Sequence, residues 1–385
     1  MHVIDLLKDR GFFNQCTDEA ALRAHLDTPR TFYIGFDPTA DSLHVGSLVQ
    51  LMAMAHLARA GHRPIAVVGG GTAKVGDPSG RDSTRDLLDP ERLEHNKRGI
   101  AAQIAKFCTG PMVDNAEWLD GLGYIQVLRE IGRYFSVNDM LRAESVRQRL
   151  DREQGLSFIE FNYVLLQSYD FLELYRRHGC TLQVGGGDQW YNIVSGMDLI
   201  RRIEGGQSFG LTTPLLTTAS GAKMGKTAAG AVWLDAAKVS PFDYFQYWMN
   251  VDDRDVERFT KLFTFVPLEA IDLRDIRAAK RALAVEATAV IHGRDAANAA
   301  DEAARAAFAG GVSANMPTVA VRFPVGVIGA LVACGVAKTN SEARRMVEGG
   351  AVSVGDHKVT DPKAQIEGPA VLWAGKKHPF RLEPA

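Results

Sequence analysis

Apolar runs alternate with glycine-rich turns and helical periodicities over about the first 219 residues of the chain. Two of these runs, residues 31–36 (TFYIGF) and 62–71 (HRPIAVVGGG), are predicted to be buried strands. Between them, residues 47–61 carry apolar side chains at helical spacing up to Gly61, which predicts a helix. Strand, helix and strand in this order form a βαβ unit, so the pattern predicts an α/β fold with a doubly wound parallel sheet.

The pattern changes after about residue 230, where strand signals fade. An alanine-rich stretch with helical spacing ends at a glycine pair, and the segment 310–319 (GGVSANMPTV) is predicted to be a linker. The residues beyond it include more Lys and Arg than Asp and Glu. We therefore expect an α/β domain over residues 1–228, an α-helical domain over 229–312 and a small α+β domain over 320–385.

Composition narrows the class of protein. Apolar residues make up 46% of the 385 residues, which is enough for packed cores, and the formal net charge of −2 excludes a chain that is basic as a whole. Cys16, Cys108, Cys180 and Cys334 form no CxxC pair, which argues against a zinc ribbon or a disulfide framework and favours a reducing cytoplasm. Charges interrupt the N-terminal apolar run, and no apolar run reaches about 18 residues, so we expect neither a secretory signal nor a membrane span.

The segment DSLHVGSL places a histidine at the mouth of the predicted helix, just after the strand over residues 31–36. Ligands of parallel sheets bind at the carboxyl ends of strands, and a helix N-terminus there favours phosphate. His44 can donate a hydrogen bond to a phosphate oxygen, and Gly46, which lacks a Cβ, allows a flat ring such as adenine to approach the backbone. The alternative is a capping or core histidine beside a packing glycine.

A second candidate phosphate site lies in the segment LLTTASGAKMGKTAAGAVWL, residues 215–234. Lys223 and Lys226 stand three residues apart in a loop of small residues. Two ammonium groups on such a loop suit a polyphosphate that is bound and then released. The alternative is a solvated surface loop.

The pairing of HVG after a strand with KMGKT farther along the chain resembles the HIGH and KMSKS motifs of the class I aminoacyl-tRNA synthetases. Four segments occur in the order typical of the bacterial-type tyrosyl-tRNA synthetases: YIGFDPTADSLHVGSL (33–48), VGDPSGR (75–81), YVLLQSYD (163–170) and VGGGDQW (184–190). The C-terminal GVAKTNSEARRMVEGGAVSVGDHKV resembles an S4 RNA-binding domain. Two motifs depart from the family pattern: Ser47 replaces the second histidine of HIGH, and Gly225 and Thr227 replace the two serines of KMSKS.

The resemblance implies a Rossmann-like catalytic domain, an α-helical anticodon-binding domain and an S4-like RNA-binding domain. It implies a ligase that activates L-tyrosine with ATP to tyrosyl-adenylate and pyrophosphate, and then transfers the tyrosyl group to the 3′ end of tRNA(Tyr). We expect ATP to enter with Mg2+ held mostly by its own phosphates and water, and no metal site on the protein. A cytoplasmic homodimer is expected, and the segment LSFIEF (156–161) offers apolar residues for a twofold interface, although Phe158 or Phe161 can equally be core.

Tyr163, Gln167 and Asp170 are four and three residues apart, so on a helix they share one face. A polar stripe of this kind is either the wall of a pocket or the solvent side of the helix. The resemblance implies that Tyr33 and Asp170 hold the phenol hydroxyl of the substrate, and that Asp77 helps to hold its ammonium group. The full set of tyrosine-binding residues that it implies is Tyr33, Asp77, Tyr163, Gln167, Asp170 and Gln189.

The glycines of VGGGDQW let the backbone approach a ligand, and Asp188 can accept hydrogen bonds from both ribose hydroxyls. A tight turn with a capping aspartate is the alternative. The resemblance implies that four catalytic side chains act on the phosphates: Thr39, His44, Lys223 and Lys226. The residues expected around the rest of ATP are Gly35, Asp37, Gly46, Gly186, Asp188 and Met224.

The sequence of residues 339–350 predicts a helix that is capped by Asn340 or Ser341 and closed by Gly349. A basic edge on and beside this helix suits RNA phosphates, although a solvated helix face explains the same charges equally well. The candidate RNA contacts are Lys338, Arg344, Arg345 and Lys358.

Three other hypotheses compete. A tryptophanyl-tRNA synthetase would share the fold, but not the Tyr33–Asp170 pair or the S4-like tail. Another adenylate-forming ligase, such as a pantothenate synthetase, would share the histidine and lysine loops, but it leaves the tail unexplained. A non-enzymatic RNA-binding protein built on an inactive synthetase would have no need of His44, Asp188 and the two lysines.

Overall fold

The structure is a computed structural model of the 385-residue chain. It describes residues 1–79, 89–153, 155–219, 221, 224, 226–227, 230–308, 316–355, 357–375 and 378–385. The chain packs into two compact units, of which the first comprises Met1–Ser240 with Val251–Leu283 and the second Pro241–Asn250 with Ala284–Ala385. The domain boundaries expected at residues 228, 312 and 320 stay a prediction.

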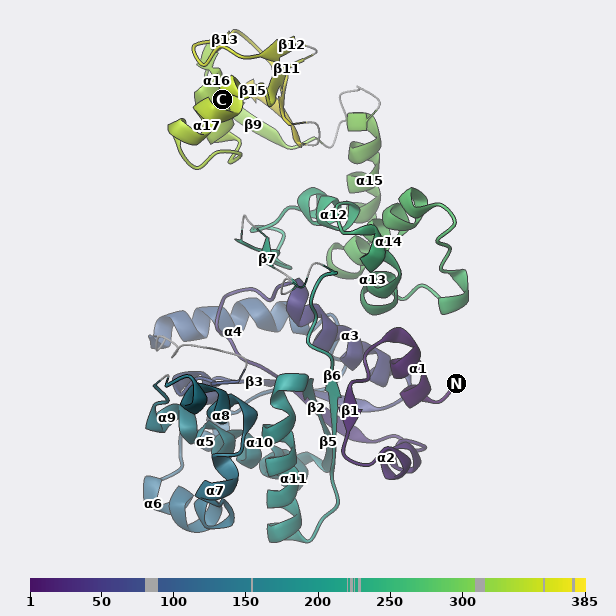
Figure 1. Cartoon of the computed structure of the whole chain (residues 1–385), viewed down its shortest axis with the longest axis vertical. Helices are drawn as coiled ribbons and strands as arrows, with labels where there is room; N and C mark the ends of the chain where they lie inside the picture. The colour runs from purple at the N-terminus through teal and green to yellow at the C-terminus, as the bar shows by residue number, and fades with distance from the viewer. Residues whose placement is uncertain are drawn as a thin grey trace. The chain divides into compact units, whose positions relative to one another are not determined.

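A six-stranded sheet forms the centre of the first unit (Figure 1). From one edge to the other, its strands are β1 (Gln15–Cys16), β6 (Phe209–Thr213), β5 (Cys180–Gly186), β2 (Thr31–Phe36), β3 (Arg63–Val68) and β4 (Met112–Asp114). All neighbours are parallel except β1, which is antiparallel to β6. The predicted α/β class is confirmed. The edge strand β1 was not predicted, because two residues are too few for a hydrophobic pattern.

The order of the strands reverses between β2 and β5. From β2 the chain moves outward to β3 and β4, and it later places β5 and β6 on the other side of β2. A reversal of this kind leaves a crevice beyond the carboxyl ends of the two central strands, where α/β sheets bind their ligands.

Helices cover both faces of the sheet (Figure 1). They are α3 (Val45–Arg59) and α4 (Pro90–Ile104) on one face, and α10 (Tyr163–His178) and α11 (Trp190–Glu204) on the other. Side chains alternate between the two faces of a strand, so Tyr33, Ile65 and Val67 point to the same side. There they pack with Phe171 of α10 and Leu199 of α11 in one hydrophobic core.

Helix α3 begins at Val45, two residues earlier than predicted. His44 explains the difference, because its Nδ1 accepts a hydrogen bond from the N–H of Gly46 at 3.0 Å. A side-chain acceptor at this position satisfies one of the unpaired N–H groups of the first turn. The alternative interpretation of His44, as a residue that caps the helix, therefore holds for its Nδ1 atom.

Helix α13 (Val256–Phe263) packs against α1 (Val3–Arg10) and α3. The buried guanidinium of Arg10 donates to three carbonyls at the C-terminal end of α13, those of Lys261 and Thr264 at 3.0 Å and that of Val266 at 2.7 Å. Carbonyls at a helix C-terminus have no partner within the helix. Arg10 supplies that partner to Thr264 from 254 residues earlier in the sequence.

Short helices fill the segment between β4 and β5: α5 (Ala116–Leu119), α6 (Tyr124–Gln126), α7 (Val137–Met140), α8 (Glu144–Asp151) and α9 (Phe158–Phe161). A buried ion pair between Arg149 and Glu160, at 3.0 Å, ties α8 to α9. Phe161 packs against the core, whereas Phe158 is 69% exposed. Among the residues that the structure describes, no helix is both long and apolar enough to span a membrane.

The second unit contains α12 (Pro241–Met249) packed against α15 (Arg294–Phe308), and helix α14 (Ile276–His292) runs from the first unit into the second. The C-terminal residues of this unit form a hydrophobic core of their own. Their sheet has the order β12 (His357–Val359), β11 (Val352–Val354), β14 (Ala370–Ala374), β15 (His378–Pro384) and β9 (Thr318–Val321), and their helices are α16 (Val327–Ala333) and α17 (Asn340–Glu348). Strands and helices thus occur together here, as predicted.

The N-cap of α17 is Thr339, so the cap predicted at Asn340 or Ser341 is wrong. Thr339 has extended backbone angles, and its Oγ1 accepts the N–H of Glu342 at 3.2 Å. Asn340 and Ser341 already belong to the helix. Gly349 closes the helix, as predicted.

Candidate active site

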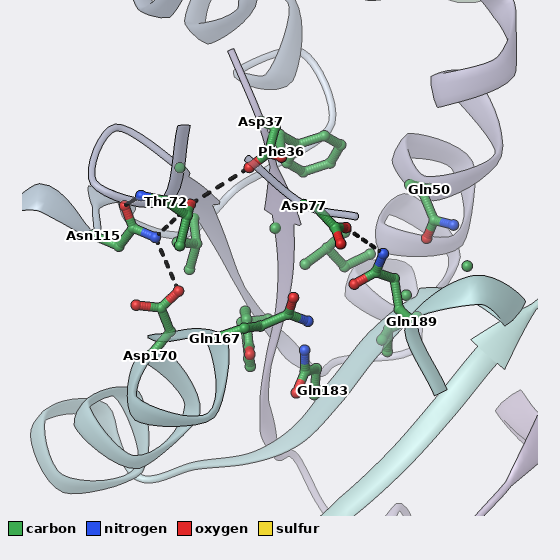
Figure 2. Close-up of a pocket in the computed structure, with 18 of the residues that line it drawn as sticks. Phe36, Asp37, Gln50, Thr72, Asp77, Asn115, Gln167, Asp170, Gln183 and Gln189 are labelled. Carbon is green, nitrogen blue, oxygen red and sulfur yellow. Dashed lines mark hydrogen bonds between the residues drawn. The ribbon is translucent and has the colours of Figure 1, made fainter. Parts of the chain in front are cut away.

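A pocket of about 250 Å³ opens beyond the carboxyl ends of β2 and β5, where the strand order reverses. Polar side chains from β2, from α10 and from the turn after β5 converge on it (Figure 2). Ten residues predicted to bind tyrosine or ATP line this pocket: Tyr33, Gly35, Asp37, Asp77, Tyr163, Gln167, Asp170, Gly186, Asp188 and Gln189. The polar face of α10 is therefore a pocket wall and not a solvent face.

Asp170 lies at one side of the pocket and is buried. The N–H of Trp118 donates to its Oδ1 at 2.7 Å, and Asn115 Nδ2 donates to its Oδ2 at 2.9 Å. Burial raises the pKa of this carboxyl to about 7, although the two hydrogen bonds oppose the shift. The side chain is thus poised between its neutral and charged forms near neutral pH.

Tyr33 is only 2% exposed, and its hydroxyl has no hydrogen-bond partner among the described residues. Burial, with a further contribution from the Asp170 carboxylate, raises the pKa of this phenol well above its usual value. The hydroxyl therefore stays protonated. A buried hydroxyl without a partner costs free energy, and a polar ligand group in the pocket would remove that cost.

Asn115 connects Asp170 to the glycine-rich turn after β3, and the sequence pattern did not predict it. Its Oδ1 accepts the N–H of Gly71 at 2.8 Å, and its Nδ2 donates to Thr72 Oγ1 at 3.0 Å as well as to Asp170. Asn115 follows β4, a strand of three residues. Such a strand leaves no hydrophobic pattern, so nothing in the sequence marks Asn115 or Trp118 as lying at a sheet edge.

A chain of amide groups lies at the other side of the pocket, around Asp77 (Figure 2). Gln189 Nε2 donates to Asp77 Oδ2 at 2.8 Å, and the N–H of Ser79 donates to Asp77 Oδ1 at 2.8 Å. Asn192 Nδ2 donates to both Gln189 Oε1 at 3.2 Å and Gln167 Oε1 at 3.1 Å. Asn192 is a further residue that the sequence pattern did not predict. It lies in the first turn of α11, and its spacing of three from Gln189, the N-cap of that helix, was the available signal.

At two glycines, neighbouring atoms occupy the space where a Cβ would otherwise lie. A Cβ on Gly186 would lie 2.5 Å from Asp188 Oδ1, and a Cβ on Gly46 would lie 2.7 Å from His44 Cε1 and 3.3 Å from the carbonyl of Met224. Gly46 thus makes room for the capping imidazole itself. Because Nδ1 accepts the capping hydrogen bond, the proton of the neutral ring is on Nε2, the tautomer that can donate to a phosphate.

Four described residues of the predicted ATP site are not in the pocket lining: Thr39, His44, Gly46 and Met224. Thr39 is exposed in the turn after β2, with its N–H donating to the carbonyl of Asp37 at 2.8 Å. Met224 is buried, and its N–H donates to the carbonyl of Leu216 at 3.1 Å. Of these, His44 is the N-cap of α3, Gly46 belongs to the first turn of that helix, and the carbonyl of Met224 lies next to Gly46.

The lysine segment is described only in part. Lys223 and Gly225 lie outside the described residues. The backbone of Lys226 belongs to strand β7 (Lys226–Thr227), which is antiparallel to β8 (Gly230–Ala231), and its side chain is outside the description. In the C-terminal part, the four candidate RNA contacts are all exposed: Lys338, Arg344, Arg345 and Lys358.

Comparison with known proteins agrees with this geometry. The family model of the class I tRNA synthetases for tryptophan and tyrosine matches residues 26–309, and that of the tyrosine–tRNA ligase SYY-like C-terminal domain matches residues 308–372. A tyrosine–tRNA ligase of Xanthobacter autotrophicus is 50% identical, over 98% of this chain and 97% of its own length. One of Desulfosudis oleivorans is 57% identical, over 77% of this chain and 71% of its own.

Among solved structures, a C-terminally truncated mitochondrial tyrosyl-tRNA synthetase of Aspergillus nidulans is similar, with a TM-score of 0.71 and 30% identity. The match covers 79% of this chain and 93% of that one. Fold, pocket position, family models and near full-length relatives all point the same way. The chain belongs to the tyrosine–tRNA ligases of bacterial type, within the class I aminoacyl-tRNA synthetases.

Proposed function

We propose that the chain joins L-tyrosine to tRNA(Tyr) in two steps. The tyrosine carboxylate attacks the α-phosphate of ATP and pyrophosphate leaves, which forms tyrosyl-adenylate; a ribose hydroxyl of the terminal tRNA adenosine then takes the tyrosyl group. The observation that carries the proposal is the buried pair of the Tyr33 hydroxyl and the Asp170 carboxyl at one side of the pocket. ATP–pyrophosphate exchange, measured with each of the twenty amino acids, should respond to tyrosine alone. Exchange driven by tryptophan, or no exchange at all, would contradict the proposal.

The two sides of the pocket suit the two ends of tyrosine. The phenol hydroxyl can donate to Asp170 and accept from Tyr33, which supplies the partner that the Tyr33 hydroxyl lacks. At the other side, the Asp77 carboxylate can neutralise the ammonium group, with Tyr163 and Gln167 as further acceptors. Gln189 then lies beside the tyrosine carboxylate. This orientation directs the carboxylate toward the glycine-rich turn after β5.

Tyr33→Phe should reduce the preference for tyrosine over phenylalanine by several-fold. The substitution removes one hydrogen bond to the phenol, which is worth on the order of 1 kcal/mol. The measurement is kcat/KM for both amino acids in pyrophosphate exchange. Tyr169→Phe is a matched control, because it removes a hydroxyl from α10 at a residue outside the pocket lining. Unchanged discrimination in Tyr33→Phe would mean that Tyr33 does not contact the phenol.

Phosphate chemistry would take place at the N-terminus of α3. The enzyme holds the reactants in line and stabilises negative charge on the phosphates, and no covalent enzyme intermediate is needed. His44 Nε2 and Thr39 would donate to the phosphates, while Lys223 and Lys226 neutralise the leaving pyrophosphate. ATP enters as its Mg2+ complex, and the ion keeps its phosphate and water ligands.

A homodimer is supported by exposed apolar side chains between β4 and β5. Large apolar residues rarely gather on the surface of a monomer. Here they include Tyr124, Ile125, Val137, Phe158 and Ile159, each at least 41% exposed. The buried Arg149–Glu160 pair ties α8 to α9, the helix that carries Phe158 and Ile159. We therefore propose that a second copy of the chain covers this surface.

Phe158→Asp should convert the dimer into a monomer, because it places a charge among the exposed apolar side chains of this segment. Sedimentation equilibrium should give twice the chain mass of 42.0 kDa for the wild type and the single chain mass for the variant. Leu273→Asp, at an exposed apolar residue elsewhere, is the control and should remain dimeric. A wild-type protein that stays monomeric would contradict the proposal.

The exposed basic residues of α17 and β12 are proposed to contact RNA phosphates, as their charge suggests. The four cysteines are free thiols, which is typical of a reducing compartment. Together with substrates such as ATP and tRNA, these thiols support a cytoplasmic location.

A further inference from the structure

The residues on both sides of the KMGKT segment are attached to two helices that pack against each other, α3 and α13. At its far end, the N–H of Val45 donates to the carbonyl of Val232, and the N–H of Leu234 donates to the carbonyl of Leu43, both at 2.9 Å. The chain that leaves the segment therefore pairs with the residues that begin α3. At its near end, the attachment is made by side chains of α13.

Asp255 and Arg258 hold the residues that lead into the segment. Asp255 Oδ2 accepts the N–H of Ala219 at 2.8 Å, and Arg258 Nη2 donates to the carbonyl of Thr217. Arg258 Nη2 also donates to Asp255 Oδ1 at 2.7 Å. The side chain of Asp255 is only 4% exposed, whereas that of Arg258 is 43% exposed, so the hydrogen bond from Ala219 to Asp255 is the one best shielded from bulk water.

The carboxylate of Asp255 is directed away from its own helix. The backbone of Asp255 has helical angles and ends a short 3-10 helix, Asp253–Asp255, whose N-cap Asp252 accepts the N–H of Arg254. Among the described residues, the Asp255 carboxylate makes no capping hydrogen bond to α13, and its Oδ2 accepts the N–H of Ala219. This carboxylate therefore holds the residues that lead into the lysine segment and not the first turn of its own helix.

Helix α13 is itself held in place by buried side chains and by hydrogen bonds at its C-terminal end. Phe259 and Phe263 are fully buried, and Arg10 ties the carbonyls at the opposite end of the helix. A residue fixed to this helix therefore has a defined position relative to α3 and to His44 at its N-terminus. Neither Asp255 nor Arg258 lines the pocket, so any effect on the reaction must pass through the segment they hold.

We infer that Asp255, aided by Arg258, is a positioning residue for the adenylate-forming step. It fixes Ala219, and with it the place where the KMGKT segment begins, so that the ammonium groups of Lys223 and Lys226 reach the phosphates of ATP. The inference rests on the proposed function of those lysines. Misplacement of charged groups by about 1 Å is enough to reduce their contribution to the transition state.

Asp255→Ala should lower the single-turnover rate of tyrosyl-adenylate formation by on the order of tenfold, while the Kd for tyrosine changes less than about twofold. Asp253→Ala is the matched control: it removes the same charge two residues earlier, from an exposed side chain paired with Lys280. Asp255→Asn keeps an acceptor for the Ala219 N–H and should recover part of the rate. A normal rate in Asp255→Ala, or a tyrosine Kd that weakens in step with the rate, would overturn the inference.

A double-mutant cycle separates positioning from general destabilisation. In a Lys226→Ala background, Asp255→Ala should slow the reaction little further, because the lysine through which it acts is gone. An equal loss of rate in both backgrounds would overturn the inference. Should Asp255→Ala fail to fold, Arg258→Ala takes its place, since it releases the carbonyl of Thr217 from an exposed position. The wild-type exchange assay tests the proposed function independently: no tyrosine-dependent exchange refutes that function, whereas a normal wild type with a normal Asp255→Ala refutes only this inference.

Discussion

Replacing Lys223 or Lys226 by alanine should slow tyrosyl-adenylate formation by on the order of a hundredfold and leave the affinity for tyrosine unchanged. In the proposed function, each ammonium group meets charge that grows on the leaving pyrophosphate, so its contribution is expected to be larger in the transition state than in the ground state. The measurement is the single-turnover rate at saturating ATP together with the equilibrium Kd for tyrosine.

Lys261→Ala provides the control for this prediction. Lys261 lies on α13 and pairs with Glu257 on the surface, so its loss changes the net charge equally without touching the segment. Weakened tyrosine binding with normal chemistry would show that the lysines act on the amino acid and not on the phosphates.

Removing residues 316–385 should leave tyrosine-dependent pyrophosphate exchange nearly intact and reduce the charging of tRNA(Tyr) by on the order of a hundredfold. The removed part has a hydrophobic core of its own, and the pocket residues all belong to the first unit. The deletion also takes away Lys338, Arg344, Arg345 and Lys358. Each lost phosphate contact should lower the log–log salt dependence of tRNA binding by roughly one unit.

A full-length variant with these four residues changed to alanine separates the effect of losing the basic charges from the effect of losing the whole C-terminal part. It keeps the core of the C-terminal part, because all four side chains are exposed. It should reproduce most of the loss in charging and in salt dependence. Full charging efficiency in both variants would show that the tail does not bind tRNA, and loss of exchange in the deletion would show that the two functions share the same residues.

Periodicity predicted the parts of the site that lie on one element. Tyr163, Gln167 and Asp170 share a helical face because 3.6 residues make a turn, and the structure places that face on the pocket. The long strands β2 and β3 were equally visible, since buried parallel strands are continuous apolar runs.

The parts that depend on contacts between distant segments were not predictable in this way. Asn115 acts on Asp170 from the end of a three-residue strand, 55 residues away along the chain. Thr339, and not its two polar neighbours, caps α17 because of backbone angles that residue type alone does not determine. Sequence pattern gives the face of an element, whereas the partner of each polar atom depends on packing in three dimensions.

The Arg10 contact has a consequence for the order in which the protein forms. Its guanidinium and the carbonyl of Thr264 are 254 residues apart in the chain. During synthesis, α1 emerges long before α13, and burial of the Arg10 guanidinium without its carbonyl partners would cost several kcal/mol. A nascent chain that ends at residue 240 already contains every pocket residue, yet it lacks the carbonyls that Arg10 needs. The contact between α1 and α13 can therefore form only after Val266 has been synthesised, later than the last strand of the six-stranded sheet.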